Sequence, residues 1–145
     1  MKPWILLFCL VALGIAAPRL QADDGDLRPS DPAVRKEVIA AIEGQLAAFR
    51  AHDLDKAYGF AAAALRLEFP PARFAEVVHR GYPEIWANVR AEYGVVNDNG
   101  ARATLNVRVY TSDDSAAYDY ELIHDPAGWR IGGVLRHAPK PADSV

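Results

Sequence analysis

A chain of 145 residues is long enough to form one domain with a sizeable core. Its 16 basic and 19 acidic residues give a formal net charge of −3, and no stretch concentrates the basic residues, which argues against nucleic acid as a partner. The single cysteine cannot form an internal disulfide, so the fold must be held by its core.

The first 22 residues have the features of a secretory signal peptide. Lys2 supplies a short positive end, Trp4 to Ala17 is an almost unbroken apolar run, and Leu20-Gln21-Ala22 ends in the small residue that a signal peptidase reads. We expect cleavage after Ala22, a periplasmic location and no stable membrane span afterwards, because the run is too short for a permanent anchor. An uncleaved anchor is the alternative. The expected organisation is a signal peptide (1–22), a flexible lead-in (23–30), one domain (31–137) and a disordered tail (138–145).

Three helices are predicted before the middle of the chain. The longest covers about Pro32–Arg50, with Ser30 or Asp31 as its cap and a proline in the first turn, where a missing N–H costs nothing. Shorter helices are expected over about Leu54–Ala63 and Pro71–Arg80. Phe69-Pro70-Pro71 breaks the chain between them, and Gly81 stops the second.

One polar residue interrupts the apolar stripe of the long helix. Val38, Ile42, Leu46 and Phe49 share a face wide enough to lie on a sheet, and Gln45 falls among them. A buried amide must find hydrogen-bond partners. Gln45 is therefore expected either to bond a neighbouring backbone group or to point into a cavity.

The second half of the chain predicts an antiparallel meander of about four strands. Alternation of apolar and polar residues places them at about Asn88–Val96, Arg102–Thr111, Ala116–His124 and Trp129–Arg136. An Asn-Gly pair suits a tight hairpin between the first two. One face of this sheet should be apolar and aromatic, and it is predicted to carry Leu105, Val107, Val109, Tyr118, Tyr120, Leu122, Trp129, Ile131 and Leu135. Val134 and Arg136 are expected on the opposite face.

Several stretches of the chain resemble a known family. They include Gln45-Leu46-Ala47-Ala48-Phe49, Gly81-Tyr82-Pro83, Tyr118-Asp119-Tyr120-Glu121-Leu122 and Gly128-Trp129-Arg130-Ile131-Gly132-Gly133-Val134. Over about Asp31 to Arg136 the chain looks like a bacterial family of exported or membrane-associated domains of unknown function within the nuclear transport factor 2-like superfamily. The resemblance implies an α+β cone, with three N-terminal helices packed on a curved antiparallel sheet of about four strands.

The resemblance also implies a ligand place at the open end of the cone. A cleft rich in aromatic residues with few polar groups is typical of a small-molecule site, and equally of a filled core. We expect a non-catalytic domain that binds a small apolar ligand or a protein partner there, without a cofactor. The lining is expected to come from Gln45, Phe49, Tyr58, Phe74, Val78, Tyr82, Trp86, Tyr118, Tyr120 and Trp129.

A small isomerase-like or hydrolase-like enzyme is the first alternative. His79 beside Tyr82 is a weak candidate for its chemistry, although the angle of His79 on its helix favours a solvent-facing position. Asp119 and Glu121 fall on the polar face of their strand, where cross-strand pairing with Arg108 and Arg130 is expected. The four histidines are scattered and no carboxylate cluster occurs, so no metal site is predicted.

An interaction module is the second alternative. The outer sheet face is predicted to carry Arg108, Tyr110, Asp119, Glu121 and Arg130. A self-complementary polar patch with one aromatic residue can support a weak homodimer. A solvated face is the simpler interpretation of the same pattern.

Overall fold

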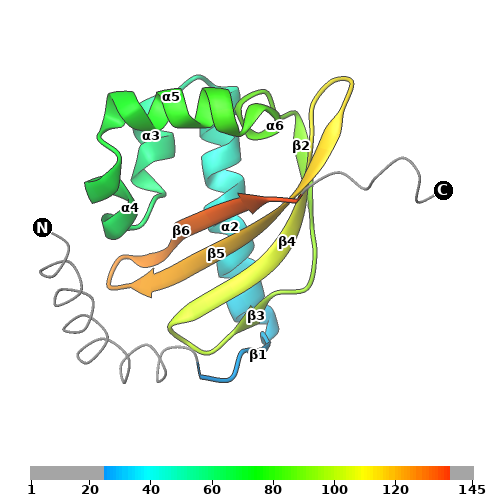
Figure 1. Ribbon diagram of the computed structural model, residues 1–145. Coiled ribbons are helices and arrows are strands. Elements are labelled where there is room, and N and C mark those ends of the chain that lie inside the picture. The colour runs from blue at the N-terminus through cyan, green and yellow to red at the C-terminus, as the bar shows by residue number, and fades with distance from the viewer. Residues whose placement is uncertain (1–24, 138–145) are drawn as a thin grey trace, which may run out of the picture.

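A computed structural model describes residues 25–137 of the chain (Figure 1). The expected signal peptide (1–22) and disordered tail (138–145) lie outside these residues. The described part forms five helices and six strands. In chain order these are β1 (Arg28–Pro29), α2 (Pro32–Arg50), α3 (Leu54–Gly59), α4 (Ala63–Glu68), α5 (Pro71–Gly81), α6 (Pro83–Trp86), β2 (Arg90–Tyr93), β3 (Asn97–Asp98), β4 (Arg102–Tyr110), β5 (Ser115–Asp125) and β6 (Gly128–Arg136).

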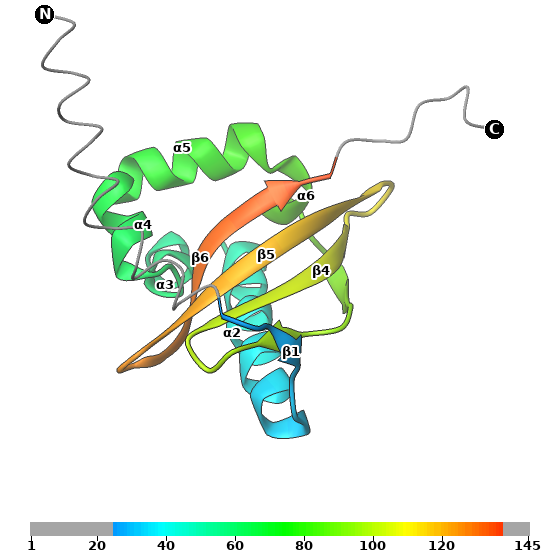
Figure 2. The ribbon, with the colours of Figure 1, turned by 60° about the horizontal axis from the view of Figure 1, so that its bottom comes forward.

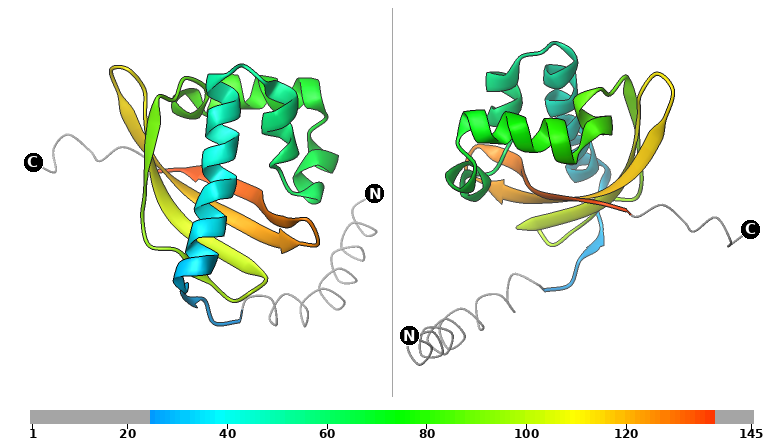
Figure 3. Two further views of the ribbon diagram at one scale, coloured as in Figure 1. Left: turned by 180° about the vertical axis from the view of Figure 1, so that it is seen from behind. Right: turned by 45° about the horizontal axis from the view of Figure 1, so that its top comes forward.

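The helices pack against one face of an antiparallel sheet. The strand order is β1-β3-β4-β5-β6, and β2 pairs with β4 as well. Seen from behind, α2 crosses the sheet while α5 and α6 lie across one end (Figure 3). The other face of β4, β5 and β6 is not covered by any described helix (Figure 2). The predicted α+β class is therefore confirmed.

The core lies between α2 and the inner face of the sheet. Asp31 caps the helix as predicted, since its Oδ1 accepts a hydrogen bond from the N–H of Val34 at 2.9 Å. The helix then buries Val38, Ile42 and Leu46 completely. The alternation predicted for β4 and β5 is confirmed, because their inward side chains join the same buried cluster: Leu105, Val107, Val109, Tyr118, Tyr120 and Leu122.

The prediction of three helices was incomplete. The second helix ends at Gly59 instead of Ala63, because the chain leaves the helix there to pair with β6. Ile131 donates its N–H to the carbonyl of Phe60 at 2.8 Å, and Ala62 donates to the carbonyl of Ile131 at 2.7 Å. The two additional helices, α4 and α6, are short and have no side-chain hydrogen bond at their N-caps, so their sequences carry little helix signature.

The sheet has six strands where about four were expected. The predicted first strand, at about Asn88–Val96, is present only as β2, and β3 lies in the segment that was expected to form the turn. The strand β1 forms inside the expected lead-in by pairing with β3. The predicted hairpin is present: Gly100 has a φ of 89°, and Asn99 Oδ1 accepts a hydrogen bond from the N–H of Arg102 at 2.8 Å.

A β-bulge in the last hairpin reverses the side-chain alternation of β6. Glu121 pairs with Gly133 but Leu122 pairs with Ile131, which leaves Gly132 as the extra residue. A Cβ on Gly132 would lie 2.9 Å from the Ile123 side chain, so the bulge requires glycine.

The predicted orientation of the end of β6 was therefore wrong. Beyond the bulge, Val134 lies opposite Tyr120 and Arg136 lies opposite Tyr118, on the inner face. Leu135 points outward and is 70% exposed. A single inserted residue thus brings a guanidinium to the inner face at the edge of the sheet.

Candidate functional site

The helix-covered side of the sheet contains a cleft of about 100 Å³. It lies between α2, the helices from α4 to α6, and β6. None of the side chains that line it is charged. The lining consists of Gln45, Phe49, Leu65, Phe69, Phe74, Val77, Val78, Tyr82, Ile85, Ile131, Gly133 and Val134.

Gln45 is the most buried polar group of this cleft, with 5% of its surface exposed. Its Nε2 donates a hydrogen bond to the carbonyl oxygen of Ala57 at 3.0 Å, as the first of the two predicted roles requires. Because a carbonyl only accepts, this bond fixes which end of the amide is nitrogen. Within the described chain, Oε1 accepts no hydrogen bond, yet it is not sealed from solvent. The amide oxygen of this lining residue is therefore an unused hydrogen-bond acceptor.

Tyr82 is the second polar side chain of the lining. Its hydroxyl donates a hydrogen bond to the carbonyl oxygen of Val134 at 3.0 Å and so ties the end of α5 to β6. Together with Gln45, the predicted residues Phe49, Phe74 and Val78 also line the cleft. Five of the ten residues expected from the sequence are thus brought together.

The other five expected residues do not line the cleft. Tyr58 donates its hydroxyl to the carbonyls of Arg66 and Phe69 and thereby supports α4. Trp86 packs between the rings of Phe49 and His79. The remaining three, Tyr118, Tyr120 and Trp129, are buried in the core.

Tyr120 is an unusual member of that core. Its hydroxyl is buried and is the one such side-chain atom of the described residues without a hydrogen-bond partner. Burial raises the pKa of the Tyr120 phenol above its ordinary range. An unpaired buried hydroxyl carries a desolvation cost, so this group contributes ring packing and no hydrogen bond.

Several lining residues were missed by the sequence analysis. Leu65 and Phe69 come from α4 and its end, a helix that was not predicted. Gly133 and Val134 reach the cleft because of the bulge in β6. The apolar spacing of α5 did place Val77 inward with Phe74 and Val78, but Val77 was not included in the expected lining.

Of the two residues considered for catalysis, Tyr82 lines the cleft and His79 does not. His79 is exposed on α5, and its ring stacks on Trp86 with centroids 4.6 Å apart. Arg108 and Arg130 are not the partners of Asp119 and Glu121, although Glu121 does pair with an arginine of the neighbouring strand β4. Asp119 lies 2.7 Å from His137 Nε2, and Glu121 pairs with Arg102 at 2.6 Å.

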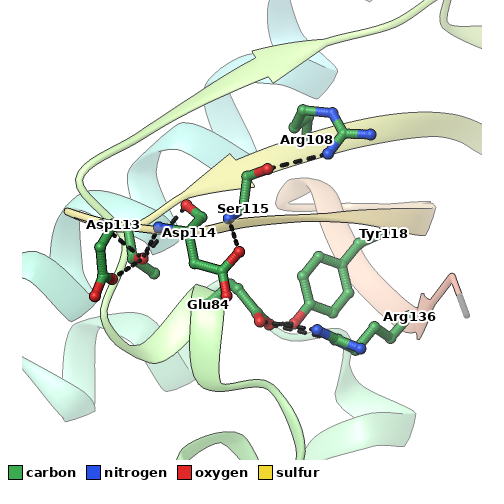
Figure 4. Close-up of polar contacts among 8 residues, drawn as sticks. Glu84, Arg108, Asp113, Asp114, Ser115, Tyr118 and Arg136 are labelled. Atoms are coloured by element: carbon green, nitrogen blue, oxygen red, sulfur yellow. Dashed lines mark hydrogen bonds and ion pairs between the residues drawn. The ribbon is translucent and has the colours of Figure 1, made fainter. Parts of the chain in front are cut away.

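A buried carboxylate forms a separate cluster beside the sheet edge (Figure 4). Glu84, on α6, is only 7% exposed and accepts three hydrogen bonds, one from the Tyr118 hydroxyl at 2.6 Å and two from Arg136 at 2.8 and 3.3 Å. The hydrogen bonds from Arg136 hold the pKa of Glu84 below its usual range, and burial raises the pKa of the Tyr118 phenol. All three groups are mutually satisfied, so the cluster joins α6 to the sheet. No pattern in the sequence indicated this cluster, because Arg136 was assigned to the opposite face.

The uncovered face of the sheet also carries a shallow trough of about 560 Å³. Its outward side chains form two rows that run across the strands from β3 to β6. Two apolar side chains of the trough are largely exposed, Val95 at 67% and Leu135 at 70%. Asp119 and Glu121 belong to the same rows. The trough is larger than the cleft but lies on an open surface, so it does not enclose a small molecule.

Two further observations concern the described part of the chain. From residue 25 to 137, no three histidine, cysteine or carboxylate side chains are grouped so that they could hold a metal ion. None of the helices described over that range combines the length and the apolar character needed to cross a bilayer.

A family model described as "Domain of unknown function (DUF4864)" matches residues 32–143. Searches of curated proteins and of solved structures found no significant match.

Proposed function

This chain belongs to the DUF4864 family of domains of unknown function, and we propose that it is a non-catalytic domain that binds a small, uncharged, largely apolar molecule. The observation that carries the proposal is the cleft. Its lining contains no charged side chain, and it adjoins the buried hydrophobic core. Apolar walls with a few placed polar groups are characteristic of small-molecule sites.

The size of the cleft limits the ligand. Sites for drug-sized molecules usually measure roughly 300 to 1,000 Å³, and an engineered apolar cavity of about 150 Å³ holds one benzene. A cleft of about 100 Å³ therefore supports the binding of a single ring or a short alkyl group. Such a group is either a whole ligand or the buried end of a longer one, including an apolar side chain of a protein partner.

Toluene should bind to the domain, and filling the cleft should abolish binding. Val77 lines the cleft from a half-buried position on α5, so Val77→Phe is expected to occupy it without a large loss of stability. In a ¹H–¹⁵N NMR titration, toluene should shift resonances of cleft residues in the native protein and leave those of the variant unchanged. Ala72→Phe adds the same ring on the exposed side of the same helix and should bind toluene like the native protein. Equal binding by both variants would contradict the proposal.

The enzyme alternative has less support. It requires His79 near a second polar group inside a cavity, whereas His79 is exposed on α5 and absent from the lining. Tyr82 is in the lining, but its hydroxyl donates to Val134. A base without access to an enclosed substrate has little to act on.

We also propose that the leader directs export to the periplasm, that the domain is a variant of the nuclear transport factor 2-like cone, and that two copies pair weakly through the uncovered sheet face. The leader sequence supports export. The helices packed on one face of the sheet support the kinship. The exposed side chains of Val95 and Leu135 support the pairing. Native mass spectrometry of protein isolated from the periplasm should show a chain beginning at Asp23 and a dimer that dissociates on dilution. An intact leader would contradict export, and an exclusively monomeric spectrum would contradict pairing. A strand order unlike that of nuclear transport factor 2-like proteins would contradict the kinship.

A further inference from the structure

We propose that the ligand of the cleft carries a hydrogen-bond donor, a hydroxyl or N–H group on an uncharged apolar body, and that Gln45 Oε1 accepts this bond. The inference rests on the proposed function and adds the chemical class of the ligand. It depends on which hydrogen-bonding groups of the cleft are already used and which are free.

The nitrogen and the oxygen of Gln45 are in different situations. Nε2 is committed to the carbonyl of Ala57, which places the donor end of the amide against α3. Oε1 has no partner in the described chain and remains accessible, although the residue is 95% buried. An amide oxygen in apolar surroundings loses free energy relative to water unless a donor reaches it. A ligand donor would remove that loss on binding.

The other side chains of the cleft supply no donor. Tyr82 has given its only hydroxyl proton to the carbonyl of Val134, and the remaining lining side chains are apolar or absent. A ketone, ether or ester oxygen would therefore meet no side-chain donor in the cleft. Because no lining residue is charged, an ammonium or carboxylate group would lose its hydration without compensation. Neutral alcohols, phenols and N–H heterocycles remain.

Phenol and toluene test the inference because they have the same number of non-hydrogen atoms and differ only in hydroxyl against methyl. Their affinities should be measured by calorimetry for the native protein and for Gln45→Met, a substitution of similar length that removes the acceptor. The ratio of toluene Kd to phenol Kd should fall about fivefold in the variant, as expected for the loss of one neutral hydrogen bond. This comparison cancels the different hydration of the two compounds. Ala72→Phe, on the exposed side of α5 and outside the lining, should leave the ratio unchanged.

A second measurement does not depend on the variant being folded. The side-chain ¹³Cδ resonance of Gln45 in the native protein should move downfield when phenol is added and should not do so with toluene. If both compounds bind with the same ratio in the native and variant proteins, or if the resonance does not respond to phenol, the inference is overturned while the proposed function stands. If neither compound binds, both fail.

Discussion

Replacing Arg136 with methionine should lower the free energy of unfolding by about 2 kcal/mol at pH 7. The substitution leaves the carboxylate of Glu84, which is 7% exposed, with Tyr118 as its remaining side-chain donor. Removing one partner of a fully buried ion pair costs about 3–5 kcal/mol. We expect only about 2 kcal/mol because the Arg136 side chain is 37% exposed, so that solvent screens part of its interaction with Glu84. Urea denaturation of the native and variant proteins measures the difference.

The difference should also depend on pH. Hydrogen bonds from Arg136 lower the pKa of Glu84 in the folded state, relative to about 4.3 in the unfolded chain. The stabilisation is therefore fully present above that value and is lost as the pH falls through the lower folded-state pKa. The variant and the native protein should become more alike in stability below about pH 4.

Arg108→Met is the matched control for this prediction. Arg108 lies on the exposed face and its guanidinium bonds only to the Ser115 hydroxyl among the contacts described, at 3.1 Å (Figure 4). Its replacement should change the free energy of unfolding by less than about 0.5 kcal/mol. Equal effects of the two substitutions would show that the Glu84 cluster does not stabilise the fold.

Gly44→Ala should destabilise the protein by about 2 kcal/mol, although alanine is the better helix former. A Cβ at this position of α2 would lie 2.4 Å from Cζ and 2.7 Å from Cε1 of the Phe60 ring. Phe60 has little freedom to retreat, because its carbonyl accepts a hydrogen bond from Ile131 and its ring packs against the core. Overpacking of this kind costs roughly 1–3 kcal/mol. Thermal and urea unfolding measure the change.

Gly59→Ala provides the comparison of opposite sign. Gly59 is the last residue of α3, and a Cβ there meets no atom within 4 Å. This substitution should raise the free energy of unfolding by roughly 0.5 kcal/mol, because alanine loses less backbone entropy on folding. Stabilisation by both substitutions would mean that Phe60 does not pack over Gly44.

Regular periodicity explains what could be predicted from the sequence. In α2, the cap at Asp31 and the 3.6-residue spacing of Val38, Ile42 and Leu46 define both the helix and its buried face. In β5, strict alternation identifies Tyr118 and Tyr120 as inward. These signals are local, and they repeat over at least two helical turns or four strand residues. Several positions in each element therefore support the same assignment.

The features that could not be predicted depend on single residues or distant contacts. Gly132 inserts one residue into β6, and the inserted residue exchanges the faces of Val134 and Leu135 without altering the composition of the strand. Glu84 is an ordinary acidic residue of a four-residue helix until the fold brings Arg136 beside it. Seven of the twelve lining residues were not expected, and some for the same reasons, since Leu65 and Val134 reach the cleft through an unpredicted helix and the bulge.

A crystal structure determined under xenon pressure tests the central claim most directly. Xenon enters apolar cavities of about the size of a benzene ring and is located without ambiguity by its scattering. The account predicts one xenon atom in the cleft, in contact with Phe74, Val78 and Ile131. A cleft without xenon, with the atom instead in the trough beside Leu135 or nowhere on the domain, would contradict it.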